Sequence, residues 1–218
     1  MKTQDDNKMT RQIIALVGSA FLLWTIYFGS YLPLQKSKAF IITLQSMDQM
    51  RSLDDVKRAF ATPFDIPSPI GQEEVVRHFA SVILSTIQRF EPDQASTSVE
   101  LVGLVKELFD PIITRQRGMS FDQNLYVLGS MHQVVALQTK DPQYLEKAEE
   151  YLTLGRQLAP HRPQFLYGLF DLYRLQGDNA KALEVANTII QLWPMDDRVK
   201  AYLESQPAQP KATTTTVR

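Results

Sequence analysis

The sequence predicts an all-α protein in which an N-terminal transmembrane helix precedes a superhelix of α-helical hairpins. Three observations support this fold class. Residues 13–34 carry no charged side chain and are long enough, as a helix, to cross the hydrocarbon core of a membrane. Apolar residues then recur at spacings of three and four, which is typical of amphipathic helices. A short pattern near the C-terminus also occurs twice with constant spacing.

The composition argues against several functional classes. The chain has 218 residues, a net charge of −1 and no cysteine. Without cysteine there are no disulfides, thiolate metal sites or cysteine nucleophiles. The near-neutral charge gives no general attraction to nucleic acid, and no basic patch with interleaved aromatic residues is present. We therefore expect no nucleic-acid partner.

The N-terminal region divides into a short polar segment, residues 1–12, and the predicted transmembrane helix, residues 13–34. Trp24, Tyr27 and Tyr31 lie in the far half of the span, where aromatic side chains settle at a membrane interface. Two alternatives remain open. One is a buried helix of a soluble domain, and the other is a cleaved signal peptide with a weak cleavage site at residues 28–30, although its apolar core would be unusually long.

The orientation of the span is weakly marked by its flanking charges. Three basic residues precede it, whereas only Lys36 and Lys38 follow it closely and Arg51 lies further on. The counts slightly favour an N-terminus inside the cell. We therefore predict a single-pass protein whose C-terminal domain lies outside the cytoplasm.

Residues 37–117 form a predicted helical spacer with degenerate repeats. A first amphipathic helix is expected around residues 39–47, and Ser52 with Asp55 forms a capping-box pattern at the start of the next helix. The three prolines between Thr62 and Pro69 predict a loop. Two further helices are expected over residues 73–90 and 99–117, and Pro111 is expected to kink the second or end it early. Their predicted core stripes are Val75, Val76, Phe79, Val82, Ile83 and Ile87, and Leu101, Leu104, Val105 and Leu108.

Residues 118–205 contain the repeat. The pairs Ala148 and Ala182, Leu152 and Ala186, and Pro160 and Pro194 each keep the same separation in sequence. In the second unit Leu166, Leu169 and Tyr173 share one helix face, Gly177 suits the end of that helix, and Asp178 can cap the next. Residues 196–205 can add a last helix. The tail, residues 206–218, has two prolines and four consecutive threonines and is expected to be disordered.

This pattern resembles the tetratricopeptide repeat (TPR) family, whose unit is a pair of helices with a period of about 34 residues. The equivalent residues named above, such as Ala148 and Ala182, have this separation in sequence. The match covers Leu128, Gly129, Ala148, Leu152, Gly155 and Pro160 in the first unit, and nearly every signature position of the second. His132 replaces the usual Tyr, and Phe170 stands where the family usually has a small residue. The resemblance implies that residues 196–205 form a capping helix. An ordinary helical bundle with a chance spacing is the alternative.

The sequence carries no catalytic pattern, so we expect no enzyme activity, no cofactor and no metal site. The three histidines are far apart, and neither a phosphate-binding loop nor a serine elbow is present. What the TPR resemblance implies instead is a concave face that binds a protein partner. The corresponding positions here could also be merely exposed, or buried by the spacer helices. They are Gln123, Tyr126, Ser130, Gln133 and Val134 in the first unit and Gln164, Tyr167, Asp171, Arg174 and Leu175 in the second.

The layout of the whole chain also resembles the C-terminal TPR region of bacterial O-antigen ligase-type membrane proteins. The matching stretches are residues 31–33, 52–60, 69–77, 124–129 and 158–165. The catalytic multi-span portion of those proteins has no counterpart here. Two functions are therefore predicted: a membrane-anchored, non-catalytic interaction scaffold, or a detached accessory part of a polysaccharide-assembly membrane protein.

Overall fold

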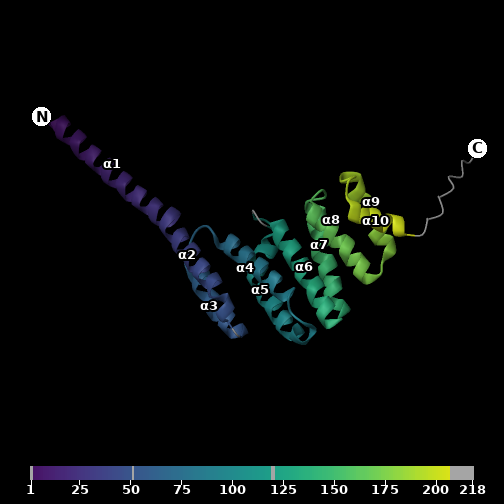
Figure 1. Cartoon of the computed structure of the whole chain (residues 1–218). Coiled ribbons are helices and arrows are strands. Elements are labelled where there is room, and N and C mark those ends of the chain that lie inside the picture. Colours follow the sequence, from purple (N-terminus) through teal and green to yellow (C-terminus); the bar gives the residue numbers. More distant parts are fainter. Residues whose placement is uncertain (1, 51, 119–120, 207–218) are drawn as a thin grey trace, which may run out of the picture. The chain divides into compact units, whose positions relative to one another are not determined.

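The computed structural model describes residues 2–50, 52–118 and 121–206, and its regular elements over these ranges are all helices (Figure 1). The chain forms two compact units, Met1–Asn124 and Leu125–Arg218, and the boundary falls inside helix α6 (Phe121–Thr139). The predicted disordered tail lies outside the described residues except for Gln206.

The first unit begins with a long helix made of α1 (Lys2–Ile26), a π-helical turn (Tyr27–Tyr31) and α2 (Leu32–Gln45). The segment Lys8–Gln45 is, among the described residues, the one helix long and apolar enough to cross a membrane. Its large apolar side chains are exposed from Met9 to Tyr31, with Leu16 72% and Leu23 68% accessible, whereas Leu32 and Phe40 further along are buried. A helix whose large apolar side chains stay uncovered lacks the burial expected of a core helix of a soluble domain.

The helix continues beyond the predicted end of the span at Leu34, and the helix expected around residues 39–47 is the C-terminal part of α2, which ends at Gln45. Pro33 is the second residue of α2 and does not interrupt it. A proline ring normally clashes with the carbonyl four residues earlier. Here the preceding turn is π-helical, and the Leu32 N–H donates to the Tyr27 carbonyl. This wider turn is where the chain accommodates the proline.

Helix α3 (Leu53–Asp65) starts at the predicted capping box. The Asp55 N–H donates to Ser52 Oγ at 3.2 Å, and the Ser52 N–H donates to the Asp55 carboxylate at 3.1 Å. The helix also includes Pro63, so the loop predicted from Thr62 begins later than expected. Pro63 cannot bond the carbonyl of Ala59, but the Thr43 hydroxyl of α2 lies 3.2 Å from that oxygen. The single Thr43 hydroxyl proton is shared between this oxygen and the Ala39 carbonyl, 3.0 Å away, so a tertiary hydrogen bond replaces part of the missing helical one.

The core of the first unit lies among α2, α3, α4 (Gln72–Ile87) and α5 (Ala95–Arg115). The predicted α4 stripe is confirmed, because its residues are buried except for the partly exposed Val82. Phe60 of α3 and Phe79 of α4 pack with ring centroids 4.4 Å apart. In α5 the prediction that Pro111 ends the helix early is wrong. Pro111 is exposed, so water can bond the carbonyl that its ring leaves free.

The second unit contains the rest of α6 and α7 (Pro142–Leu158), α8 (Pro163–Gln176), α9 (Asn179–Leu192) and α10 (Asp197–Ser205). Consecutive helices pack against each other from α7 to α10. The predicted cap is confirmed, because Asp178 accepts from the Lys181 N–H, and Asp141 likewise caps α7 by accepting from the Gln143 N–H. Gly177 ends α8 with φ +72°, a left-handed conformation that glycine adopts without strain.

Small residues allow close helix packing in this unit. Ala148, Ala182 and Ala186 are fully buried, as the repeated pattern predicts. Gly155 of α7 faces the ring of Phe165 of α8 so closely that a Cβ atom built on it would lie 2.0 Å from a ring carbon. The absence of a side chain at Gly155 is therefore what lets α7 and α8 approach.

The turns that follow α7 and α9 have the same geometry at equivalent positions of the repeat. The helices end at Leu158 and Leu192, and the next residues have φ −137°, ψ 74° (Ala159) and φ −131°, ψ 79° (Trp193). In both turns this residue donates its N–H to a carbonyl in the last turn of the helix. Ala159 donates to the Gly155 carbonyl at 2.9 Å, and Trp193 donates to the Ile189 carbonyl at 2.7 Å. The following helices, α8 and α10, begin at Pro163 and Asp197, which keep the same separation.

Candidate partner-binding face

Four of the predicted partner-binding residues form one stripe on α8. Gln164, Tyr167, Asp171 and Arg174 follow each other at spacings of three and four, which places them on the same side of the helix. We call this stripe, together with Arg198 of α10, the α8 face. Gln164 and Arg174 are exposed, whereas Tyr167 and Asp171 are half-buried.

The α8 face contacts α10 and its preceding turn. The Tyr167 hydroxyl donates to the carboxylate of Asp196, the residue that caps α10 by accepting from the Val199 N–H at 2.9 Å. The Tyr167 ring stacks on Trp193, with centroids 5.9 Å apart. Asp171 lies 3.3 Å from the Arg198 guanidinium. Tyr167 therefore helps to hold α10 in place, and Asp171 adds a solvent-exposed ion pair with a small stabilising effect, in addition to any role at an interface.

Two guanidinium groups lie over aromatic rings on this face. Arg174 is 5.3 Å from the Phe170 ring centroid and 5.5 Å from that of Tyr202. Arg198 is 5.3 Å from the Tyr167 centroid. Both arginines also pair with the one carboxylate of Asp171, at 3.6 Å and 3.3 Å. The side chains of Arg174 and Arg198 remain 48% and 53% exposed, so these preordered cations can still bond an incoming group.

The predicted residues of α6 are placed differently. Gln123 belongs to the first unit, where its side-chain oxygen accepts from Arg77 at 3.2 Å. In the second unit the Tyr126 ring packs edge-on against Phe165, and the Gln133 amide donates to the Gly168 carbonyl at 2.8 Å. Ser130 is half-buried. Tyr126 and Gln133 thus join α6 to α8 and leave little of their surface for a ligand.

Sequence reasoning missed Arg198, Trp193 and Tyr202 as parts of this face. The signal was present for Arg198, because it follows Gln164 at the separation of the other repeated pairs and so occupies the same position in the next unit. Residues 196–205 were expected only to cover an apolar end. The aromatic residues carried no such signal, since their contacts depend on how α10 packs.

A second polar cluster joins α7, α8 and α9. The Glu149 carboxylate accepts from Lys181 at 2.8 Å, from Tyr173 at 3.2 Å and from Gln176 at 3.4 Å. Burial by itself would raise the pKa of Glu149, but these hydrogen bonds outweigh it and hold the pKa below its usual value. The cluster is an interhelical connection. No group of three or more potential metal-ligating side chains occurs among the described residues.

The hydroxyl of Tyr167 and the carboxylate of Asp196 shift each other's ionisation. Burial, together with the hydrogen bond to Asp196, raises the pKa of Tyr167 to about 12. The hydrogen bonds from Tyr167 and from the Val199 N–H lower the pKa of Asp196. Asp196 therefore stays ionised down to a lower pH in the folded state than in the unfolded chain.

These shifts predict acid destabilisation of the second unit. A carboxylate whose pKa is lowered by folding contributes stability above its unfolded pKa, near 4, and loses it as the pH falls through the folded pKa. We expect protection of α9 and α10 amides against hydrogen exchange to fall below about pH 4. Asp196→Asn should weaken this dependence, whereas Glu204→Gln, at an exposed carboxylate of α10, should preserve it. Equal pH dependence in Asp196→Asn and the unmodified chain would contradict the assignment.

Comparison with protein-family models, with curated proteins and with solved structures yields no match to this chain.

Proposed function

We propose that this protein is a membrane-anchored, non-catalytic scaffold whose second unit is a short TPR-like superhelix that binds a protein partner. The observation that carries the proposal is the turn repeated after α7 and α9, where Ala159 and Trp193 have nearly the same backbone angles. A recurring turn places each new hairpin on the previous one in the same way, which is how helical repeats build an extended binding surface. In this arrangement α10 is the first helix of a third unit.

The anchor is the apolar segment Ile13–Leu34. Its exposed apolar side chains and its continuity with α2 support insertion into a membrane. The flanking charges slightly favour an orientation with the second unit outside the cytoplasm, and the resemblance to bacterial O-antigen ligase-type proteins implies the bacterial inner membrane. The other predicted function, assistance to a polysaccharide-assembly membrane protein, stays a prediction of the sequence resemblance.

The partner meets the chain at the α8 face. Arginine is enriched among residues that contribute most to binding, and guanidinium groups held over aromatic rings lose little conformational freedom when they bind. Tyr167 is a poor probe of this interface because its hydroxyl is bonded to the cap of α10. Arg174 and Arg198 are better probes because both side chains are about half exposed.

Site-specific photocrosslinking in cells tests the proposal. A benzophenone amino acid in place of Gln164 should give a discrete crosslinked species in the membrane fraction, whereas the same group in place of Lys147, exposed on α7, should not. Arg174→Ala with Arg198→Ala should weaken that crosslink about tenfold or more. A membrane-bound chain that gives no discrete product at Gln164, or equal products at both positions, would argue against a partner at this face.

A further inference from the structure

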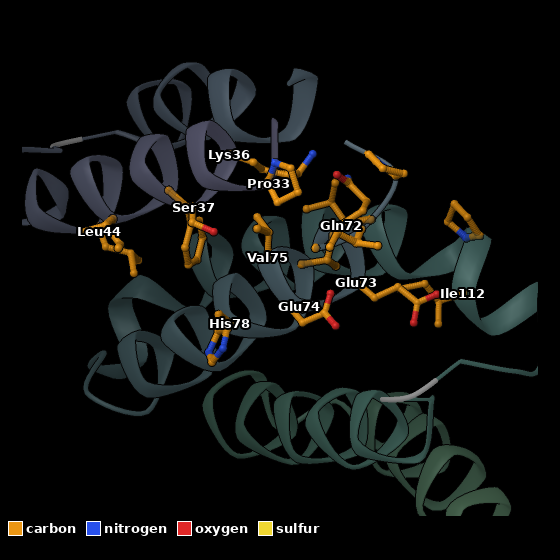
Figure 2. A pocket seen from close by; sticks show the side chains of 18 of the residues that line it. Pro33, Lys36, Ser37, Leu44, Gln72, Glu73, Glu74, Val75, His78 and Ile112 are labelled. Atoms are coloured by element: carbon orange, nitrogen blue, oxygen red, sulfur yellow. The ribbon is translucent and has the colours of Figure 1, made fainter. Parts of the chain in front are cut away.

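The first unit contains a cavity of about 1080 Å³ between α2, α4 and α5. Figure 2 shows it from close by, with Pro33, Ser37 and Leu44 on α2 and with Val75 and His78 on α4. Its volume is slightly above the usual range for small-molecule pockets, about 300–1,000 Å³. The wall formed by α2 is a single stripe at helical spacing, made of Pro33, Lys36, Ser37, Phe40, Ile41 and Leu44.

The Lys and Arg side chains in the cavity wall are already bonded within the protein. Lys36 donates to the carbonyls of Ile66 at 2.7 Å and Phe64 at 3.5 Å, at the C-terminal end of α3. Arg115 is 3.1 Å from Glu73 and also donates to the Pro111 carbonyl at 2.9 Å. Among the described residues that line the cavity, no Lys or Arg side chain is therefore left uncommitted for an anionic group. The carboxylates of Glu73 and Glu74 also line the cavity and further disfavour an anionic group, while the α2 wall is mostly apolar and suits a hydrocarbon ligand.

The cavity begins where the predicted span ends. Pro33 is the second-to-last residue of the segment 13–34, and from Pro33 to Leu44 the helix rises about 16 Å. At the rim, Ile41 is 52% and Ile70 58% exposed. An apolar surface of this kind, continuous with a transmembrane helix, is open to molecules that come from the bilayer.

We propose that this cavity binds a hydrocarbon chain of a membrane lipid, which enters past Pro33 and lies along the α2 stripe while the headgroup stays outside. The proposal rests on the membrane anchor described above. Burial of apolar surface on both the chain and the wall supplies the driving force. A partner α-helix is a poorer fit, because it is about 10–12 Å across and the cavity is already walled by three helices.

Photolabelling in vesicles tests the proposal. The full-length chain is reconstituted into phosphatidylcholine vesicles whose lipid carries a diazirine at the end of one acyl chain, and labelled peptides are mapped by mass spectrometry. We expect labels in the span and also on two stretches that line the cavity, residues 69–78, in and just before α4, and residues 108–115 of α5.

Matched substitutions on α2 distinguish the cavity from general membrane contact. Ser37→Trp fills the cavity and should reduce labelling of α4 and α5 severalfold. Ser37→Leu, a smaller replacement that is less able to disturb folding, should reduce the same labelling to a lesser extent. Lys38→Trp, exposed on the same helix but outside the lining, should leave labelling unchanged.

The outcomes separate the cavity from the anchor. Labels confined to residues 13–34, or equal labelling in all variants, would overturn the lipid-binding proposal while leaving the anchor intact. Absence of label from residues 13–34 would refute the anchor itself.

Discussion

Gly155→Ala is expected to destabilise the second unit by about 3 kcal/mol or more. The added Cβ would lie 2.0 Å from one ring carbon of Phe165 and 2.4 Å from another. Phe165 is fully buried, so its ring cannot move away without displacing α8 from α7. We expect the melting midpoint of the second unit to fall by about 10 °C or more. Hydrogen exchange of the α7 and α8 amides, measured on the detergent-solubilised full-length chain, would monitor this transition.

Two further glycines provide controls for this prediction. At Gly168 of α8 a Cβ would lie 3.0 Å from the flexible end of Leu152, so Gly168→Ala should cost less than Gly155→Ala. At Gly103, inside α5, a Cβ would meet nothing within 4 Å, and alanine there should stabilise its helix by about 0.5–1 kcal/mol. A melt of Gly155→Ala that matches the unmodified chain would show that α7 and α8 do not pack in this way.

Ala182→Glu is the second substitution with a large expected effect. Ala182 is fully buried where α9 packs on α8, and a carboxylate placed there would lose its hydration without a prepared partner. The expected cost is about 4 kcal/mol or more, enough to unfold a unit of ordinary stability. Loss of far-UV helicity and rapid proteolysis of the region after α7 would report it.

The matched control is the same substitution at Ala180, in the first turn of α9. Ala180 is exposed there, and a negative charge at a helix N-terminus interacts favourably with the helix dipole. Ala180→Glu should therefore leave the melting midpoint unchanged or raise it slightly. Equal stability of the two variants would contradict the inward placement of Ala182.

Local sequence signals predicted the second unit well, because its helix ends are set by residues near in sequence. Asp178 and Gly177 mark the turn between α8 and α9 through one side-chain hydrogen bond and one left-handed backbone angle. Prolines in the first unit misled the prediction for the opposite reason. Pro63 lies inside α3, where a hydrogen bond from Thr43 contributes to compensating for it, and Pro111 lies inside α5 at an exposed position. Thr43 is distant in sequence, so no local pattern shows this compensation.

The candidate face was predicted in part. Spacing alone places Tyr167, Asp171 and Arg174 on one side of α8, as the structure has them. Their partners on α10 depend on tertiary packing, which spacing does not specify. The result is that Tyr167 supports the fold, whereas the guanidinium groups of Arg174 and Arg198 remain about half exposed.

Cysteine labelling across the membrane tests the anchored-scaffold account most directly, because the natural chain has no cysteine and each introduced thiol is unique. Met9→Cys lies before the predicted span, and Met195→Cys lies at the exposed turn before α10. In intact spheroplasts a membrane-impermeant maleimide should label the cysteine at 195 and should reach the one at 9 only after the membrane is permeabilised. Labelling of both positions from the same side, or recovery of the chain in the soluble fraction, would contradict the account.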